Sequence, residues 1–217
     1  MIIGTRFNGP PGSGNGGYSA GLFAAEKAGD GSPEVTLRMP PPLDTPLTLA
    51  GGKVETPEGS VVAELLPADT ITVTVPPIGY ADAAQASAGY SGFAEHPFPT
   101  CYVCGPERAD GLRIFPGALE DGTTAAPWTV PDDVTAPVVW AALDCPGGWA
   151  VIQSGRPWVL GRIAARVTRV PAPGERCVVR GALAETEGRK ALVHTTLYDG
   201  SGDELARARA TWIAIAR

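Results

Sequence analysis

Gly16-Gly17-Tyr18 occurs again 131 residues later as Gly147-Gly148-Trp149, with an aromatic residue directly after each glycine pair. At the same offset, residues 38–44 (RMPPPLD) match residues 169–175 (RVPAPGE) in the arginine, two prolines and the closing acidic residue. After a slip of one or two residues, the string ETPEG at 55–59 is matched by ETEG at 185–188. We interpret these matches as an internal duplication, because the period is too long for a solenoid repeat. Two fused copies predict a pseudo-twofold pair with a site between them.

The length of 217 residues accommodates two domains of about 100 residues each. We predict a first unit at residues 1–79, a connecting segment at 80–99 and a second unit at 100–217. The net charge of −6 and the absence of a basic stripe argue against a nucleic-acid partner. The chain start lacks the apolar region of a signal peptide, and no run reaches the ~20 apolar residues that span a bilayer. We therefore expect no membrane segment and a cytoplasmic location.

Four cysteines, Cys101, Cys104, Cys145 and Cys177, are too few and too dispersed for a disulfide framework, so we predict free thiols. The pair Cys101-x-x-Cys104, with His96 nearby, could begin a metal site. A structural zinc site takes four ligands, however, and no second pair with ligand spacing exists in the sequence. The sequence-based prediction is therefore no metal and no cofactor.

Alternating and β-branched segments separated by Gly- and Pro-rich turns predict that each copy holds one helix and several strands. Asn15 is placed to cap the first helix, at residues 17–28, and a second helix is expected within 138–153. A small-residue stretch at 81–88 could form a further helix in the connecting segment. Strands are expected at residues 35–39, 47–49, 61–66, 71–75, 112–115, 125–129, 163–170, 177–184, 191–198 and 205–216. The predicted unit is a sheet wrapped around one helix.

This unit, together with three strings of sequence, resembles the hotdog fold of acyl-CoA thioesterases. Residues 100–115 (TCYVCGPERADGLRIF) are similar to the C-F-V-C-G … N-P … G-L-x-L-x-F start of the phenylacetyl-CoA thioesterase-like group. Residues 205–212 (LARARATW) resemble its closing strand, and Asn15-Gly16-Gly17 resembles its His-Gly-Gly helix start. The resemblance implies an α+β double hotdog over almost the whole chain, with an acyl-CoA or another acyl thioester as the small-molecule partner. Pairing of two such chains as a homodimer is compatible with it.

The chain departs from that group at the carboxylate usually found eight residues beyond the first glycine. Ala24 and Gly155 occupy those two positions. Glu26 lies two residues further on, about 200° around a helix, so it does not substitute without a register shift. The histidine before the glycine pair is replaced by Asn15 in one copy and by Pro146 in the other.

Thioester hydrolysis requires donors for the developing oxyanion and a base that activates water. The glycine pairs could supply the donors, because the first N–H groups of a helix have no intrahelical partner. Gly17 and Gly148 are the predicted oxyanion donors, with Gly16 and Gly147 beside them, and close helix packing is the alternative role.

Asp144 is the candidate base, because burial among aromatic and aliphatic neighbours would raise the pKa of its carboxyl group. A helix N-cap is its alternative role. Asn15 and Asn8 could orient a water molecule or a thioester carbonyl, although asparagine in glycine-rich loops more often serves turn geometry. Tyr18 and Trp149 would line an acyl or aryl pocket, or else are plain core residues.

These observations favour an acyl-CoA thioesterase that hydrolyses a small or medium acyl or aryl thioester at the interface of the two units. The alternative is a non-catalytic acyl-thioester-binding protein, supported by the missing carboxylate at Ala24 and Gly155. A hydratase of the same fold would need a paired Asp and His beside the helix, and neither copy has one.

Overall fold

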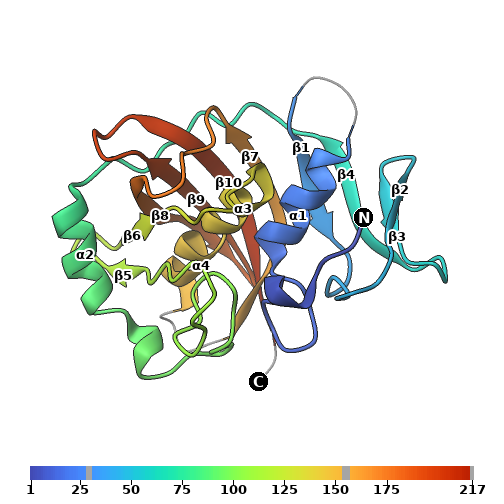
Figure 1. Cartoon of the computed structure of the whole chain (residues 1–217), viewed down its shortest axis with the longest axis horizontal. Coiled ribbons are helices and arrows are strands. Elements are labelled where there is room, and N and C mark those ends of the chain that lie inside the picture. Colours follow the sequence, from blue (N-terminus) through green and yellow to red (C-terminus); the bar gives the residue numbers. More distant parts are fainter. Residues whose placement is uncertain (28–30, 153–156, 216–217) are drawn as a thin grey trace.

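The computed structural model describes residues 1–27, 31–152 and 157–215, and these form one continuous antiparallel sheet with helices against it (Figure 1). In the described residues the sheet has ten strands in the order β2-β3-β4-β1-β7-β10-β9-β8-β6-β5. The amino-terminal part contributes α1 (Gly16–Ala25), β1 (Pro33–Leu37), β2 (Thr48–Ala50), β3 (Lys53–Glu55) and β4 (Val61–Pro67). The rest contributes α2 (Tyr80–Ala88), β5 (Gly117–Ala118), β6 (Thr124–Thr129), α3 (Ala136–Ala142), α4 (Cys145–Ile152), β7 (Trp158–Val167), β8 (Arg176–Glu187), β9 (Lys190–Tyr198) and β10 (Glu204–Ala214).

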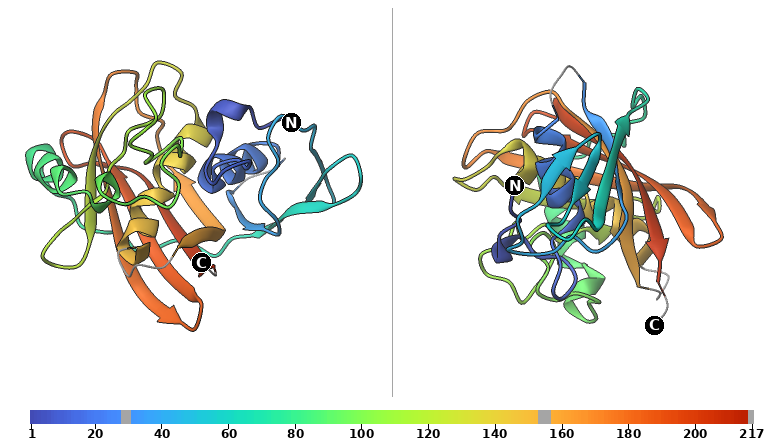
Figure 2. Two further views of the ribbon diagram at one scale, coloured as in Figure 1. Left: turned by 90° about the horizontal axis from the view of Figure 1, so that it is seen from below. Right: turned by 90° about the vertical axis from the view of Figure 1, so that its right-hand side faces the viewer.

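The two parts of the sheet meet where β1 pairs with β7, with Val35 opposite Ile163. Outward from this seam the strands run β1-β4-β3-β2 on one side and β7-β10-β9-β8 on the other. On each side, the strand at the seam is the first one after the helix, β1 after α1 and β7 after α4. The next strand outward is the last in that part of the chain, β4 or β10, and the two before it in the chain follow. Figure 2 shows the blue and cyan strands of the first part continuing the sheet of the orange and red strands. This common order supports the duplication inferred from the sequence.

One of the three sequence matches is contradicted by this order. The turn at 55–59 joins β3 to β4, whereas the turn at 185–188 joins β8 to β9. Counted from the seam, β3 and β4 correspond to β9 and β10, so the two turns are not equivalent. Both connect antiparallel strands, and glycine is common in such turns whatever their position in the fold.

Two predicted strands are absent from the described structure. Residues 71–75 cross the sheet and are held by side chains, since Thr196 Oγ1 accepts from the Val75 N–H and Tyr198 Oη donates to the Val75 carbonyl. Residues 112–115 form a loop, because Arg113 has a left-handed φ of 53° that no extended strand tolerates. The structure also adds the short strands β3 and β5, and the helix expected within 138–153 is divided into α3 and α4.

Helix α1 lies close against α3 because two glycines face it. The Asn15 Oδ1 accepts from the Tyr18 N–H at 2.8 Å, which caps the helix as predicted. A Cβ on Gly17 would lie 2.7 Å from the Trp140 carbonyl oxygen, and one on Gly21 would lie 2.7 Å from the Trp140 Cβ. The two helix backbones can approach this closely only because these side chains are absent.

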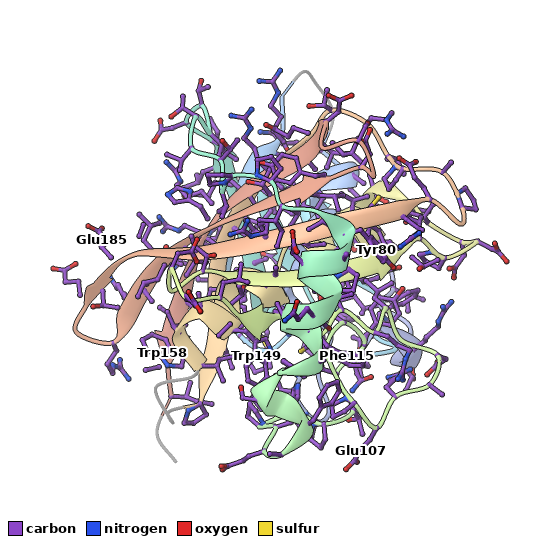
Figure 3. The ribbon with its side chains drawn as sticks, turned by 90° about the vertical axis from the view of Figure 1, so that its left-hand side faces the viewer. Tyr80, Glu107, Phe115, Trp149, Trp158 and Glu185 are labelled. Atoms are coloured by element: carbon purple, nitrogen blue, oxygen red, sulfur yellow. The ribbon has the colours of Figure 1, made fainter. Side chains whose placement is uncertain are left out.

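The far end of the sheet is covered by α2, whose placement confirms the helix expected at 81–88 (Figure 3). Ala83 packs against Ala125 of β6 and Val178 of β8 in a small apolar cluster. The Arg176 guanidinium lies over the Tyr80 ring, 3.8 Å from its centroid. Within the described ranges, no helix combines the length and apolar composition that a membrane span requires.

Candidate active site

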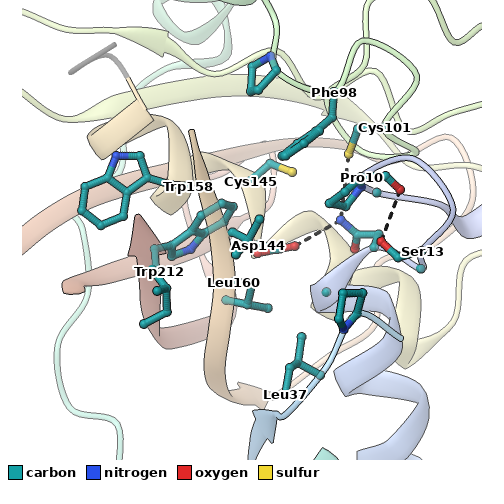
Figure 4. A pocket seen from close by; sticks show the side chains of 18 of the residues that line it. Pro10, Ser13, Leu37, Phe98, Cys101, Asp144, Cys145, Trp158, Leu160 and Trp212 are labelled. Carbon is teal, nitrogen blue, oxygen red and sulfur yellow. Dashed lines mark hydrogen bonds between the residues drawn. The ribbon is translucent and has the colours of Figure 1, made fainter. Parts of the chain in front are cut away.

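A pocket of ≈ 440 Å³ opens at the seam between the two parts of the chain (Figure 4). Its walls come from the loop at 9–16, the end of β1, the segment at 96–104, helix α4, and strands β7 and β10. The lining is predominantly apolar, with the indoles of Trp149, Trp158 and Trp212 and the side chain of Leu160 among its members. Such a site suits an apolar group held by a few polar contacts.

Asp144 is the carboxylate of this pocket and lies in the turn between α3 and α4, where it is only 2% exposed. Its Oδ2 accepts from the Gly17 N–H at 3.0 Å and from the Asn15 amide Nδ2 at 3.1 Å. Its Oδ1 is buried and has no hydrogen-bond partner within the described parts of the chain. One oxygen of the carboxylate is therefore fixed, and the other retains its full capacity to accept a proton.

Burial raises the pKa of the Asp144 carboxyl to about 7, even though the hydrogen bonds from Gly17 and Asn15 favour its charged form. The low-polarity surroundings penalise the charge more than two donors can offset. A carboxyl with a pKa in this range can both take up and release a proton near neutral pH, which is what acid–base catalysis needs.

The site joins residues that are far apart in the chain. Asn15 and Gly17 come from the start of α1, and Asp144 comes from the second part of the chain, 127 residues beyond Gly17. Asn15 serves two purposes, because its Oδ1 caps α1 while its Nδ2 reaches Asp144. Asp144 and Asn15 were both predicted as candidate catalytic residues, and the structure places them in direct contact.

The expected roles of the glycine pairs need correction. The Gly17 N–H donates to Asp144, so it is not free to hold an oxyanion in this structure. Gly147 and Gly148 serve packing, because a Cβ on Gly147 would lie 2.7 Å from the Val193 side chain and one on Gly148 would overlap the Trp212 ring. Gly16 alone of the four lines the pocket, as the first residue of α1.

Two other predicted residues lie outside the pocket. Asn8 donates to the Thr100 carbonyl and accepts from Arg108, which ties the amino-terminal loop to the loop at 100–108. Tyr18 stacks on Phe7 with ring centroids 3.8 Å apart, and both rings pack edge-on against the buried ring of Tyr102. Trp149 does line the pocket and packs edge-on against His96.

The two positions at which the thioesterase group usually has a carboxylate, eight residues beyond the first glycine of each pair, are Ala24 and Gly155 in this chain. Ala24 packs against the core, and Glu26 is exposed at the end of α1. Neither lines the pocket, and Gly155 lies outside the described residues. Asp144 is thus the carboxylate that the described structure places in direct contact with the glycine pair of α1.

Sequence reasoning missed most of the pocket walls. Trp158 and Leu160 lie on β7 and Trp212 on β10, and nothing in a strand pattern shows which buried residues face a cavity. It also missed that Cys145 lies beside Cys101 and Cys104, with the three sulfur atoms within 4.8 Å of one another. All four cysteines are free thiols, as predicted. Hydrogen bonds from the Cys104 and Cys145 thiols lower the pKa of Cys101. Burial raises the pKa of Cys104, and hydrogen bonds with Cys101 and Cys104 together with burial raise the pKa of Cys145.

A candidate thioesterase from Novosphingobium aromaticivorans is similar over 100% of this chain and 94% of its own, with a TM-score of 0.63 and 17% sequence identity. The fold is a hotdog. A thioesterase superfamily protein aligns with 54% of this chain and 61% of its own length, at a TM-score of 0.48 and 21% identity. The E. coli PaaI protein from the phenylacetic acid degradation operon aligns with 63% and 96%, at a TM-score of 0.48 and 12% identity. No family model matches the chain, and no curated protein matches it by sequence.

The α+β hotdog fold, implied by the sequence resemblance, is therefore confirmed. At these levels of identity the likeness establishes the fold alone. An activity must be argued from the pocket and its residues, because one fold supports many functions.

Proposed function

We propose that this protein hydrolyses an acyl-CoA thioester at the seam between two hotdog units in tandem, residues 1–79 and 100–217, joined by 80–99. The observation that carries the proposal is Asp144, a buried carboxylate with one oxygen held by Gly17 and Asn15 and the other unpartnered, at an apolar pocket. The matching strand order on either side of β1 and β7 supports the tandem arrangement.

In the proposed reaction, Asp144 Oδ1 takes a proton from a water molecule as the water oxygen attacks the thioester carbonyl carbon. The carbonyl oxygen then gains the negative charge. The Gly16 N–H can donate to it, because Gly16 lines the pocket and the first amide of a helix has no intrahelical partner. The carbon–sulfur bond then breaks, and the departing thiolate takes the proton back from Asp144. Carboxylic acid and free thiol are the products.

The pocket volume and lining indicate the acyl group. A space of ≈ 440 Å³ bounded by three indoles suits a small or medium acyl chain or an aryl group. Arg38 lines the pocket with a half-exposed side chain, in an ion pair with Glu64. A guanidinium in this position could exchange that partner for a phosphate of CoA.

A specific observation favours the second candidate, a binding protein that does not hydrolyse its ligand. The Gly17 N–H is occupied by Asp144, so one of the two expected oxyanion donors is already used. A pocket that binds a thioester without a complete oxyanion site would hold it unchanged. The two candidates differ in turnover and agree in binding.

The test is thiol release from a panel of short, medium and aryl acyl-CoAs by the parent protein and by Asp144→Asn. The Asn side chain keeps an oxygen for the Gly17 and Asn15 donors but cannot act as a base, so we expect about 10²- to 10⁴-fold slower turnover with the fold intact. Asp132→Asn, on an exposed aspartate twelve residues earlier, is the matched control and should be unchanged.

Thiol release that survives Asp144→Asn would refute Asp144 as the base. Calorimetric binding of the same thioesters, with no release by the parent, would refute hydrolysis and support the binding protein.

A further inference from the structure

Three cysteine sulfurs converge at the edge of the pocket. Cys101 and Cys104 lie in one loop and Cys145 is the first residue of α4, yet their Sγ atoms all lie within 4.8 Å of one another. Each of the three side chains is at most 4% exposed, and each lines the pocket. Zn–S bonds are about 2.3 Å long, so two thiolates on one tetrahedral zinc are about 3.8 Å apart. The observed sulfur separations therefore require only small side-chain adjustments to hold an ion.

The loop that carries the first two sulfurs has a tight conformation. The Gly105 N–H donates to the Cys101 carbonyl at 2.9 Å, and a Cβ on Gly105 would lie 2.5 Å from the Cys101 nitrogen. The loop can therefore turn back on itself only with glycine at 105, which brings the two cysteines of the C-x-x-C pair to one side. This spacing is typical of a pair of zinc ligands.

His96 is the nearest candidate for a fourth ligand, but its hydrogen bonds give it another role. Its Nδ1 accepts from the Phe98 N–H at 2.8 Å, so in the neutral ring the proton is on Nε2. That Nε2 lies 3.4 Å from Cys104 Sγ and therefore donates to the sulfur. A nitrogen that carries a proton does not ligate a metal, so His96 orients the Cys104 sulfur by a hydrogen bond instead.

Cys101 has a donor of its own. The Asn15 Nδ2 lies 4.0 Å from Cys101 Sγ and forms a weak N–H···S contact (Figure 4). Two of the three sulfurs thus face N–H donors, which can stabilise the negative charge of a thiolate when a metal ion displaces the thiol proton. Thiolates are the form in which cysteine binds metals.

We propose that Cys101, Cys104 and Cys145 bind one zinc ion through three thiolates, with the fourth position open to a water molecule on the pocket side. A soft, all-sulfur ligand set selects thiophilic ions such as zinc over magnesium or calcium. The site holds together the loop at 101–104 and the start of α4, so it fixes the turn that carries Asp144. Zinc binding requires no thioester and no turnover, so it can be tested independently of the proposed hydrolysis.

The test measures metal directly. The protein is purified with a non-thiol reductant, stripped with a chelator, and titrated with Zn²⁺ or with Co²⁺ as a spectroscopic probe. We expect one zinc per chain, sulfur-to-cobalt charge-transfer absorption in the near ultraviolet, and a zinc-dependent rise in melting temperature. Less than about one tenth of an equivalent bound at micromolar zinc would overturn the proposal, because structural zinc sites bind far more tightly than that.

Variants assign the ligands. Cys101→Ser, Cys104→Ser and Cys145→Ser should each lose the zinc and the cobalt absorption, whereas Cys177→Ser, at a buried cysteine of β8 outside the cluster, should retain both. Metal binding unchanged in the three cluster variants would overturn the assignment. Should any of them fail to fold, the stoichiometry and cobalt spectrum of the parent still decide the question.

His96→Ala tests the role of the ring. We expect it to keep one zinc per chain with about 10- to 100-fold weaker affinity, as for a residue that orients a ligand. Complete loss of zinc in this variant would overturn the three-thiolate assignment.

Discussion

The substitution Gly17→Ala sets helix propensity against tertiary packing. Propensity alone would raise the free energy of unfolding, whereas the packing of α1 on α3 would lower it. In an isolated helix, alanine is more stable than glycine by roughly 0.5–1 kcal/mol. In this protein the new Cβ would lie 2.6 Å from the Asp144 Cβ, 2.7 Å from the Trp140 carbonyl oxygen and 3.1 Å from the Ala141 Cα. Two of these three atoms are backbone, so they move only if α3 moves.

Overpacking of this kind costs about 1–3 kcal/mol, and more where backbone must shift. The overlap outweighs the gain in propensity, so we expect a net loss of about 1–2 kcal/mol in the free energy of unfolding. Urea denaturation at matched protein concentration measures it. Gly4→Ala is the control, because Gly4 has a φ of −66° and a Cβ there would lie no closer than 3.8 Å to any neighbour.

A Gly17→Ala protein as stable as the parent, or more stable, would refute the close contact of α1 with α3. Thiol release should also fall, since displacement of α1 removes the Gly17 N–H from Asp144.

Three further predictions concern the site and its surroundings. Asn15→Ala should lower the free energy of unfolding by about 1 kcal/mol through loss of the helix cap, as measured by urea unfolding. It should also lower kcat because Asp144 loses its amide donor, and an unchanged kcat in steady-state kinetics would contradict this second effect. Tyr198→Phe should cost about 1–2 kcal/mol by leaving the Val75 carbonyl unpaired, as measured by thermal unfolding, and no change would contradict the anchoring of 71–75. Leu160→Ala should widen the pocket beside Gly16 and shift preference towards longer acyl chains in the thiol-release panel, whereas an unchanged chain-length profile would contradict the placement of Leu160 in the acyl site.

Local patterns accounted for much of the fold. The Asn15 cap and the run of small residues after it predicted α1, and alternating β-branched segments predicted β7 to β10 to within a few residues. These features depend on interactions between neighbours in the chain, so their signal is present in the sequence. The strands predicted at 71–75 and 112–115 were wrong because tertiary contacts and backbone conformation override the local pattern there. They have the composition of strands, but one crosses the sheet and the other turns at Arg113.

The candidate site shows the same division. Asp144 was proposed as the base because a lone carboxylate next to a glycine pair is visible in the sequence, and Asn15 was proposed because it stands where the group that the sequence resembles has a histidine. The hydrogen bond from the Gly17 N–H to Asp144 was not foreseeable, because it depends on how α1 and α3 pack. The proximity of Cys145 to Cys101 and Cys104 was not foreseeable either, because Cys145 follows Cys104 by 41 residues and meets it only in the folded chain.

Periodicity and capping residues were thus sufficient for the first helix, the resemblance of three strings of sequence to a known family implied the hotdog fold, and Asp144 was proposed as the base from its place beside a glycine pair. The seam between β1 and β7, the shape of the pocket and the meeting of three sulfurs arose only when segments more than forty residues apart came together. The physical reason is the sequence distance over which each kind of interaction acts. Caps, turns and amphipathic patterns act over a few residues, whereas a catalytic or metal site is set by packing between elements that carry no mark of their future neighbours.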